Sequence, residues 1–133
     1  MALTEGTRKI VAGWPEGGVT MQCAEAVKYG DFVAVDANGK LEPCDSDDAE
    51  HGRFIAAASG ATDEYIPVYV WAIIDGFTGG TEGGALYPSG TPGALSESIE
   101  TDAGDSNEIV GYVLTETMIM VIPSCRADGV VAT

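Results

Sequence analysis

Two short segments carry enough carboxylate and amide oxygens to suggest a site for a hard cation such as calcium. The residues concerned are Asp45, Asp47, Asp48, Glu50, Asp102, Asp105 and Asn107. The first segment lacks the spacing of an EF-hand loop, because Ala49 interrupts the acidic run and no glycine stands at the sixth position. We therefore interpret both segments as solvated acidic loops and predict no bound metal.

Nucleophilic catalysis of the Ser–His–Asp or Cys–His type would depend on His51, because it is the only histidine in the chain. A zinc site could combine His51 with Cys23, Cys44 and Cys125, but these residues lack the short ligand spacings of structural zinc sites. The odd number of cysteines and the absence of a CxxC motif favour reduced thiols over a disulfide framework. We predict no catalytic residue among them.

Paired carboxylates can hydrolyse glycosides, and the 21 Asp and Glu residues allow many chance pairs. A glycosidase also needs a deep cleft, for which a chain of 133 residues with short strands offers little room. The sequence therefore favours a protein that is not an enzyme.

The glycines within residues 75–84 are a possible phosphate-binding loop. Such a loop is followed by Lys and by Ser or Thr at the start of a helix, and neither feature follows here. We predict that this segment is a flexible or subunit-contacting loop and that the protein has no cofactor.

The length of 133 residues fits one domain, and the hydrophobic content of 45% argues against disorder. Glycine is abundant, and Val, Ile, Tyr and Trp recur in short clusters, which is typical of an all-β fold with tight turns. No apolar run approaches the ~20 residues of a membrane span, and the N-terminus does not resemble a signal peptide. We expect the protein not to be exported by that route.

The formal net charge is −15, with only six Lys and Arg residues. Nucleic acids and anionic membranes are therefore disfavoured as partners, and a partner should offer basic or apolar surface. Residues 1–20 carry no net charge, because Glu5 and Glu16 balance Arg8 and Lys9. A neutral leading segment on an acidic body predicts an arm that docks on a partner.

Apolar runs bounded by Gly, Pro and Asn predict strands at 19–23, 31–35, 40–41, 52–58, 64–74, 85–87, 93–96, 108–115 and 117–122. The dipeptide of Asn38 and Gly39 predicts a hairpin, because both residues tolerate a positive φ. We expect an all-β body at 19–123, folded as a small β-sandwich or β-barrel with long acidic and glycine-rich loops. An extended arm at 1–18 precedes it, with one short strand at most, and a loose tail at 124–133 follows.

We expect the core to include Phe32, Val33, Val35, Phe54, Ile55, Val68, Val70, Ile109, Val113 and Ile119. The longest predicted strand, 64–74, is apolar on both faces, and a single domain normally covers only one. We therefore predict self-association through one face of this strand. The residues on that face are Tyr65, Tyr69, Trp71 and Ile73.

The order of short motifs between Val27 and Pro123 resembles one group of proteins. The motifs are KYGDFVAV at 28–35, GKL at 39–41, GRFIAAA at 52–58, VYVWAIIDG at 68–76, GALYP at 84–88, GALS at 93–96, IVGYVL at 109–114 and MIMVI at 118–122. In this order they resemble the small β-rich cement, or decoration, proteins of tailed-phage capsids. The resemblance covers roughly the last three quarters of the chain.

This resemblance implies a structural virion protein, made in the host cytoplasm, that binds the outer surface of an icosahedral phage head. It implies the major capsid protein as partner, stabilisation of capsomer contacts and, commonly, homotrimers. We expect the arm to be poorly ordered in the free protein and to dock on the capsid through Ile10, Val11 and Trp14. The alternative is a β-sandwich module of a phage fibre or tail that binds a receptor or a glycan.

Overall fold

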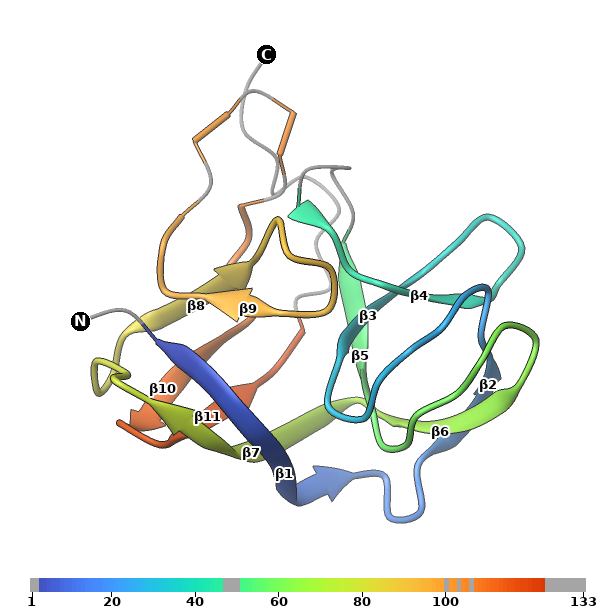
Figure 1. The fold of residues 1–133 in the computed structure, drawn as a ribbon, viewed down its shortest axis with the longest axis horizontal. Helices are drawn as coiled ribbons and strands as arrows, with labels where there is room; N and C mark the ends of the chain where they lie inside the picture. The colour runs from blue at the N-terminus through green and yellow to red at the C-terminus, as the bar shows by residue number, and fades with distance from the viewer. Residues whose placement is uncertain (1–2, 47–50, 100, 103, 106, 124–133) are drawn as a thin grey trace.

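The computed structural model describes residues 3–46, 51–99, 101–102, 104–105 and 107–123. These residues form eleven β-strands in two antiparallel sheets and contain no α-helix, so the all-β prediction is confirmed. Figure 1 shows the two sheets side by side, with the chain passing from one to the other between β6 and β7. The predicted tail at 124–133, Cys125 and the acidic residues Asp47, Asp48 and Glu50 lie outside the described residues.

The first sheet has six strands in the order β1-β7-β11-β10-β8-β9. Their bounds are Thr4–Trp14 for β1, Trp71–Thr78 for β7, Met118–Val121 for β11, Gly111–Thr115 for β10, Ala85–Pro88 for β8 and Leu95–Ser96 for β9. β1 and β9 are the two edge strands, and each pairs with one neighbour only.

The second sheet has five strands in the order β2-β6-β5-β3-β4. Their bounds are Val19–Gln22 for β2, Tyr65–Tyr69 for β6, Gly52–Ala56 for β5, Phe32–Val35 for β3 and Leu41–Pro43 for β4. This sheet curls until its two ends meet, because Cys23 forms a parallel bridge with Leu41. The Ala24 N–H also donates to the Leu41 carbonyl at 2.7 Å. The fold thus combines the two predicted alternatives, a sandwich and a barrel.

Two hydrophobic clusters follow from this curling. Phe32 and Ala34 of β3 pack with the inner face of the six-stranded sheet, whereas Val33 packs within the five-stranded sheet. Successive strand residues point to opposite faces. β3 is therefore buried on both faces, one in each cluster.

Six of the ten predicted core residues are at least 95% buried, namely Phe32, Val33, Ile55, Val68, Val113 and Ile119. Phe54 is half-buried. Val35, Val70 and Ile109 are 37%, 38% and 59% exposed, so their assignment to the core was wrong. Val35 ends its strand, Val70 separates two strands, and Ile109 precedes β10, where Val110 is buried in its place.

The predicted hairpin around Gly39 is confirmed, with Val35 opposite Leu41. Only Gly39 adopts a positive φ, and Asn38 does not. The Asp36 carboxylate accepts the N–H groups of Asn38 at 2.8 Å and Lys40 at 2.9 Å. The turn is therefore stabilised by an aspartate side chain, and one left-handed residue is sufficient to reverse the chain.

The predicted long strand at 64–74 is two strands in two different sheets. β6 ends at Tyr69, β7 begins at Trp71, and the Val70 N–H between them donates to the Trp14 carbonyl at 2.7 Å. β7 also continues to Thr78, so residues 75–78 are strand and not the predicted glycine-rich loop. Gly76 is required there, because it has a φ of 102° and a Cβ would lie 2.0 Å from the Thr7 carbonyl oxygen.

The N-terminal segment is extended, as predicted, but its strand is much longer than the single short strand that we expected. Residues Thr4–Trp14 form an 11-residue strand, β1, paired along β7 from Thr78 to Trp71. The extra length of β7 supplies this partner. Docking against β7 satisfies backbone groups that a free arm would leave in water.

Candidate interaction surface

One row of side chains crosses the outer face of the six-stranded sheet. Register places Ala12 opposite Ile73, Ile73 opposite Met120, Met120 opposite Tyr112 and Tyr112 opposite Ala85. Their neighbours along the strands, such as Ala72, Ile119 and Val113, are buried in the core, so this row points the other way. The row is apolar over five strands.

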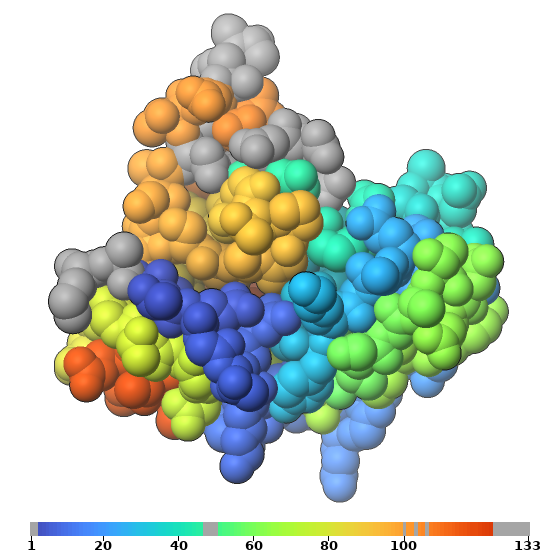
Figure 2. Space-filling model, viewed as in Figure 1, coloured from blue at the N-terminus to red at the C-terminus, as the bar shows by residue number. Residues whose placement is uncertain are grey.

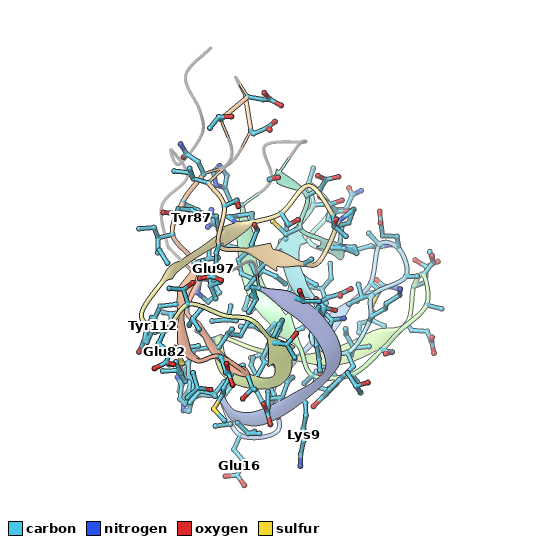
Figure 3. The ribbon with its side chains drawn as sticks, turned by 60° about the vertical axis from the view of Figure 1, so that its left-hand side comes forward. Lys9, Glu16, Glu82, Tyr87, Glu97 and Tyr112 are labelled. Carbon is cyan, nitrogen blue, oxygen red and sulfur yellow. The ribbon has the colours of Figure 1, made fainter. Side chains whose placement is uncertain are left out.

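A second pair of residues extends this apolar row. Trp14 and Trp71 are direct register partners on β1 and β7. Trp14 is 56% exposed, and Ile122, two residues beyond Met120, is 47% exposed. We call Trp14, Trp71, Ile73, Met120, Tyr112 and Ile122 the outer apolar face. Figure 3 shows Tyr112 at the margin of the molecule.

The outer apolar face is bounded by a pair of opposite charges. Lys9 of β1 lies opposite Asp75 of β7 in the register. Figure 3 shows Lys9 projecting away from the body. The two charges cancel, although the chain as a whole carries −15. This pair therefore adds no net charge at the border of the outer apolar face.

The structure divides the predicted interface residues between the two sheets. This division differs from the predicted one between capsid contact and self-association. Trp71 and Ile73, predicted for self-association, lie on β7 beside Trp14, which was predicted for capsid contact. Tyr65 and Tyr69 lie on β6 in the other sheet, and Tyr65 is 67% exposed.

The remaining two arm residues, Ile10 and Val11, have different environments. Ile10 packs against the core, whereas Val11 is 47% exposed at an irregularity in the β1 register. Met120, Tyr112 and Ile122 were missed as surface residues. For Met120 and Ile122 the signal was present in the sequence, since residues 118–122 are apolar at both alternating sets of positions.

A cavity of about 630 Å³ lies beside the two edge strands of the six-stranded sheet. Leu3, Glu5 and Arg8 line it from β1 and the residue before it, and Leu95 and Ser96 line it from β9. The rest of the wall comes from residues within 26–31 and 89–94, together with Pro43 of β4 and Phe77 of β7. In Figure 2 the dark-blue residues of β1 lie below the gold residues around position 90.

An ion pair between Arg8 and Asp31 lies in the wall of this cavity. The Arg8 Nη2 atom is 2.8 Å from Asp31 Oδ1, and the two side chains are only 10% and 8% exposed. The Lys28 N–H donates to the second carboxylate oxygen at 2.9 Å, and Arg8 Nε is 3.2 Å from Glu5 Oε1. The Ile10 N–H donates to Tyr29 Oη at 2.6 Å. These contacts hold β1 against the loop that precedes β3.

A second polar contact joins the two sheets elsewhere. His51 Nδ1, just before β5, lies 3.2 Å from Oε1 of Glu108, just before β10. The Glu108 side chain is 3% exposed, and its Oε2 has no hydrogen-bond partner among the described residues. His51 lies at the strand edge, as predicted, and is partly buried.

The structure separates the residues of the conceivable zinc site. Cys44 is buried in the cluster beneath the six-stranded sheet, and Cys23 is buried in the other cluster. Burial, together with the negative charge of Glu64, raises the pKa of the Cys23 thiol above its ordinary value of 9.0. The described residues contain no group of three His, Cys, Asp or Glu side chains that could hold a metal ion. Of the acidic loop residues, Asp102 is exposed but Asp105 is buried.

Comparisons of the chain with protein-family models, with curated proteins and with solved structures found no match. Within the described ranges, no helix is long and apolar enough to cross a membrane. Function is therefore inferred from the residues and their geometry.

Proposed function

We propose that this chain is a capsid cement protein that binds the outer surface of an icosahedral tailed-phage head and stabilises contacts between capsomers. The observation that carries the proposal is the outer apolar face. Trp14, Trp71 and Tyr112 lie on one side of a sheet whose opposite side already packs the core. Contiguous exposed apolar surface of this kind is typical of a protein interface.

The partner is the major capsid protein, and the outer apolar face makes the contact. Buried Trp and Tyr residues supply much of the binding free energy at protein interfaces. The motif order along residues 28–122 supports the choice of a phage capsid as the partner. Neither an enzymatic activity nor nucleic-acid or membrane binding is proposed, and the protein acts on the virion surface after synthesis in the host cytoplasm.

Copies of the chain associate with one another on the capsid, and the resemblance implies that they form homotrimers. Tyr65 supports a separate surface for this contact, because it is 67% exposed on β6 and does not belong to the six-stranded sheet. Trp71 and Ile73 instead share the face of Trp14. We therefore assign Trp71 and Ile73 to the capsid contact and keep only Tyr65 for contact between copies, because Tyr69 packs against the core.

A second candidate is a receptor- or glycan-binding module of a phage fibre or tail. The cavity of about 630 Å³ favours it, because this volume suits a small ligand and its wall carries the hydroxyl groups of Ser89, Thr91 and Ser96. Phe77 also lines the cavity but is only 4% exposed, so it offers little stacking surface to a sugar.

Copy number distinguishes the two candidates. Purified particles are separated on a denaturing gel, and the band of this chain is compared by densitometry with that of the major capsid protein. A cement protein is present in hundreds of copies per particle, whereas a fibre module is present in few. A low copy number would overturn the cement proposal in favour of the receptor-binding module.

A further inference from the structure

The turn between β3 and β4 presents an asparagine followed by a glycine at the surface of the molecule. Asn38 and Gly39 are both exposed, and apart from the adjoining residues nothing lies within 4 Å of the position that a Cβ would take on Gly39. The Asn38 side-chain amide makes no hydrogen bond to another described residue, since only its main-chain N–H is bonded. The side chain is therefore free to turn toward the main chain that follows it.

This arrangement allows the main-chain nitrogen of Gly39 to approach the Asn38 side chain. A side chain on the residue after an asparagine would crowd the ring that such an attack forms, and glycine has none. The Gly39 N–H donates to the Asp36 carbonyl oxygen at 3.0 Å, so the nitrogen reacts only after this bond opens. Solvent-exposed hydrogen bonds in turns open at little cost in free energy. The fold therefore slows the attack without preventing it.

We propose that Asn38 is a site of spontaneous deamidation, which converts it to aspartate or isoaspartate. The Gly39 main-chain nitrogen forms a bond to Asn38 Cγ, and the bond from Cγ to Nδ2 breaks. The Gly39 proton leaves with Nδ2 as ammonia, and a cyclic succinimide remains. Water then opens the succinimide at either of its carbonyl carbons, and no group is oxidised or reduced. This inference does not depend on the proposed function.

The isoaspartate product changes the turn, because its linkage adds one carbon to the main chain. Asp36 Oδ1 accepts the N–H groups of Asn38 at 2.8 Å and Lys40 at 2.9 Å. An extra main-chain carbon between these amides moves them apart, so one oxygen no longer accepts both. The aspartate product keeps the native main chain and adds only a negative charge.

The altered turn acts on the closure of the five-stranded sheet. Leu41 is fully buried, forms the bridge with Cys23 and accepts the Ala24 N–H at 2.7 Å. Its register opposite Val35 is set by the turn that joins β3 to β4. Isoaspartate at position 38 should therefore weaken the contact by which the two ends of this sheet meet.

Peptide mapping by mass spectrometry, after incubation of the folded native chain in mildly alkaline buffer, tests the proposal. We expect deamidation at Asn38 and none at Asn107, the other asparagine in the chain, because Asn107 is followed by Glu108. The folded chain should react at most about tenfold more slowly than a peptide of residues 34–42, because one hydrogen bond has to open. Asn38→Gln, which would have to form a larger ring, should stay unmodified. Deamidation at Asn38 no faster than at Asn107 would overturn the proposal.

Hydrogen–deuterium exchange of the isoaspartate form, separated by chromatography, tests the effect on the sheet. The Ala24 amide should exchange roughly two- to tenfold faster than in the native chain. The Val70 N–H, which donates to the Trp14 carbonyl over the same 2.7 Å, is the matched control and should keep its rate. Asn38→Asp adds the charge without the extra carbon and should also leave Ala24 unchanged. An unchanged rate at Ala24 in the isoaspartate form, or an equal increase in Asn38→Asp, would overturn the main-chain effect.

Discussion

Trp14 and Trp71 lie directly opposite each other on β1 and β7, at the outer surface of the six-stranded sheet. Cross-strand aromatic pairs contribute about 0.2–1 kcal/mol to a sheet. That is small beside the binding free energy that two exposed or half-exposed indole rings can supply. If the proposed function is right, the pair contributes more to capsid binding than to folding.

The first prediction concerns this pair. Trp14→Ala and Trp71→Ala should each weaken capsid attachment by about tenfold or more while changing the free energy of unfolding little. Sedimentation of the variants with expanded capsids measures the affinity. Val19→Ala, on exposed β2 of the other sheet, is the matched control and should bind as the native chain does. Unchanged binding by both tryptophan variants would remove the outer apolar face from the proposed contact.

The second prediction concerns the ion pair that holds β1. Arg8→Ala leaves the Asp31 carboxylate buried without its cation and should cost about 3–5 kcal/mol of unfolding free energy. Lys40→Ala breaks the pair with Asp63, whose side chain is 68% exposed, and should cost less than about 1 kcal/mol. Urea denaturation of both variants provides the comparison. Equal losses would show that burial does not distinguish the two pairs.

The third prediction uses one core residue and one misassigned residue. Val113 is 1% exposed and Ile109 is 59% exposed. Val113→Ala should destabilise the fold by about 2–4 kcal/mol, whereas Ile109→Ala should change its stability by no more than about 0.5 kcal/mol. Thermal and chemical denaturation measure both. A large loss for Ile109→Ala would contradict the placement of Ile109 at the surface.

The fourth prediction follows from the raised pKa of Cys23. In the unfolded chain this thiol has a pKa near 9.0. Its pKa is higher in the folded state, so there is a pH range in which only the unfolded chain ionises it. Its contribution to stability is therefore complete below pH 9 and is lost as the pH rises above that value. Denaturation midpoints across this range should fall more steeply for the native chain than for Cys23→Ala. Parallel curves would mean that Cys23 ionises equally in both states.

Periodicity predicted most strands but not their sheets. Alternation continues from Ile66 to Ile74 with one interruption, yet Val70 divides the run between two sheets. A period of two specifies which face a side chain takes, but the sheet it enters depends on pairing with distant strands. The length of β1 was underestimated for the same reason, because it depends on pairing with the distant strand β7.

The candidate site could be predicted only in part. Trp14 and Trp71 are conspicuous by residue type, and both were assigned to interfaces from the sequence. Their proximity arises from the β1–β7 register, which no local signal specifies. The Arg8–Asp31 pair was not predicted either, because it joins β1 of one sheet to the loop that precedes β3 of the other.

The pairing of β1 with β7 also has a kinetic consequence. β1 leaves the ribosome well before β7, its hydrogen-bonding partner, which begins only at Trp71, so the pairing is strongly non-local. Contacts of this kind slow folding and leave strand edges open to other chains in the meantime. A nascent chain interrupted before Trp71 would carry an unpaired edge strand that includes Trp14, and such fragments should aggregate more readily than fragments that extend beyond Thr78.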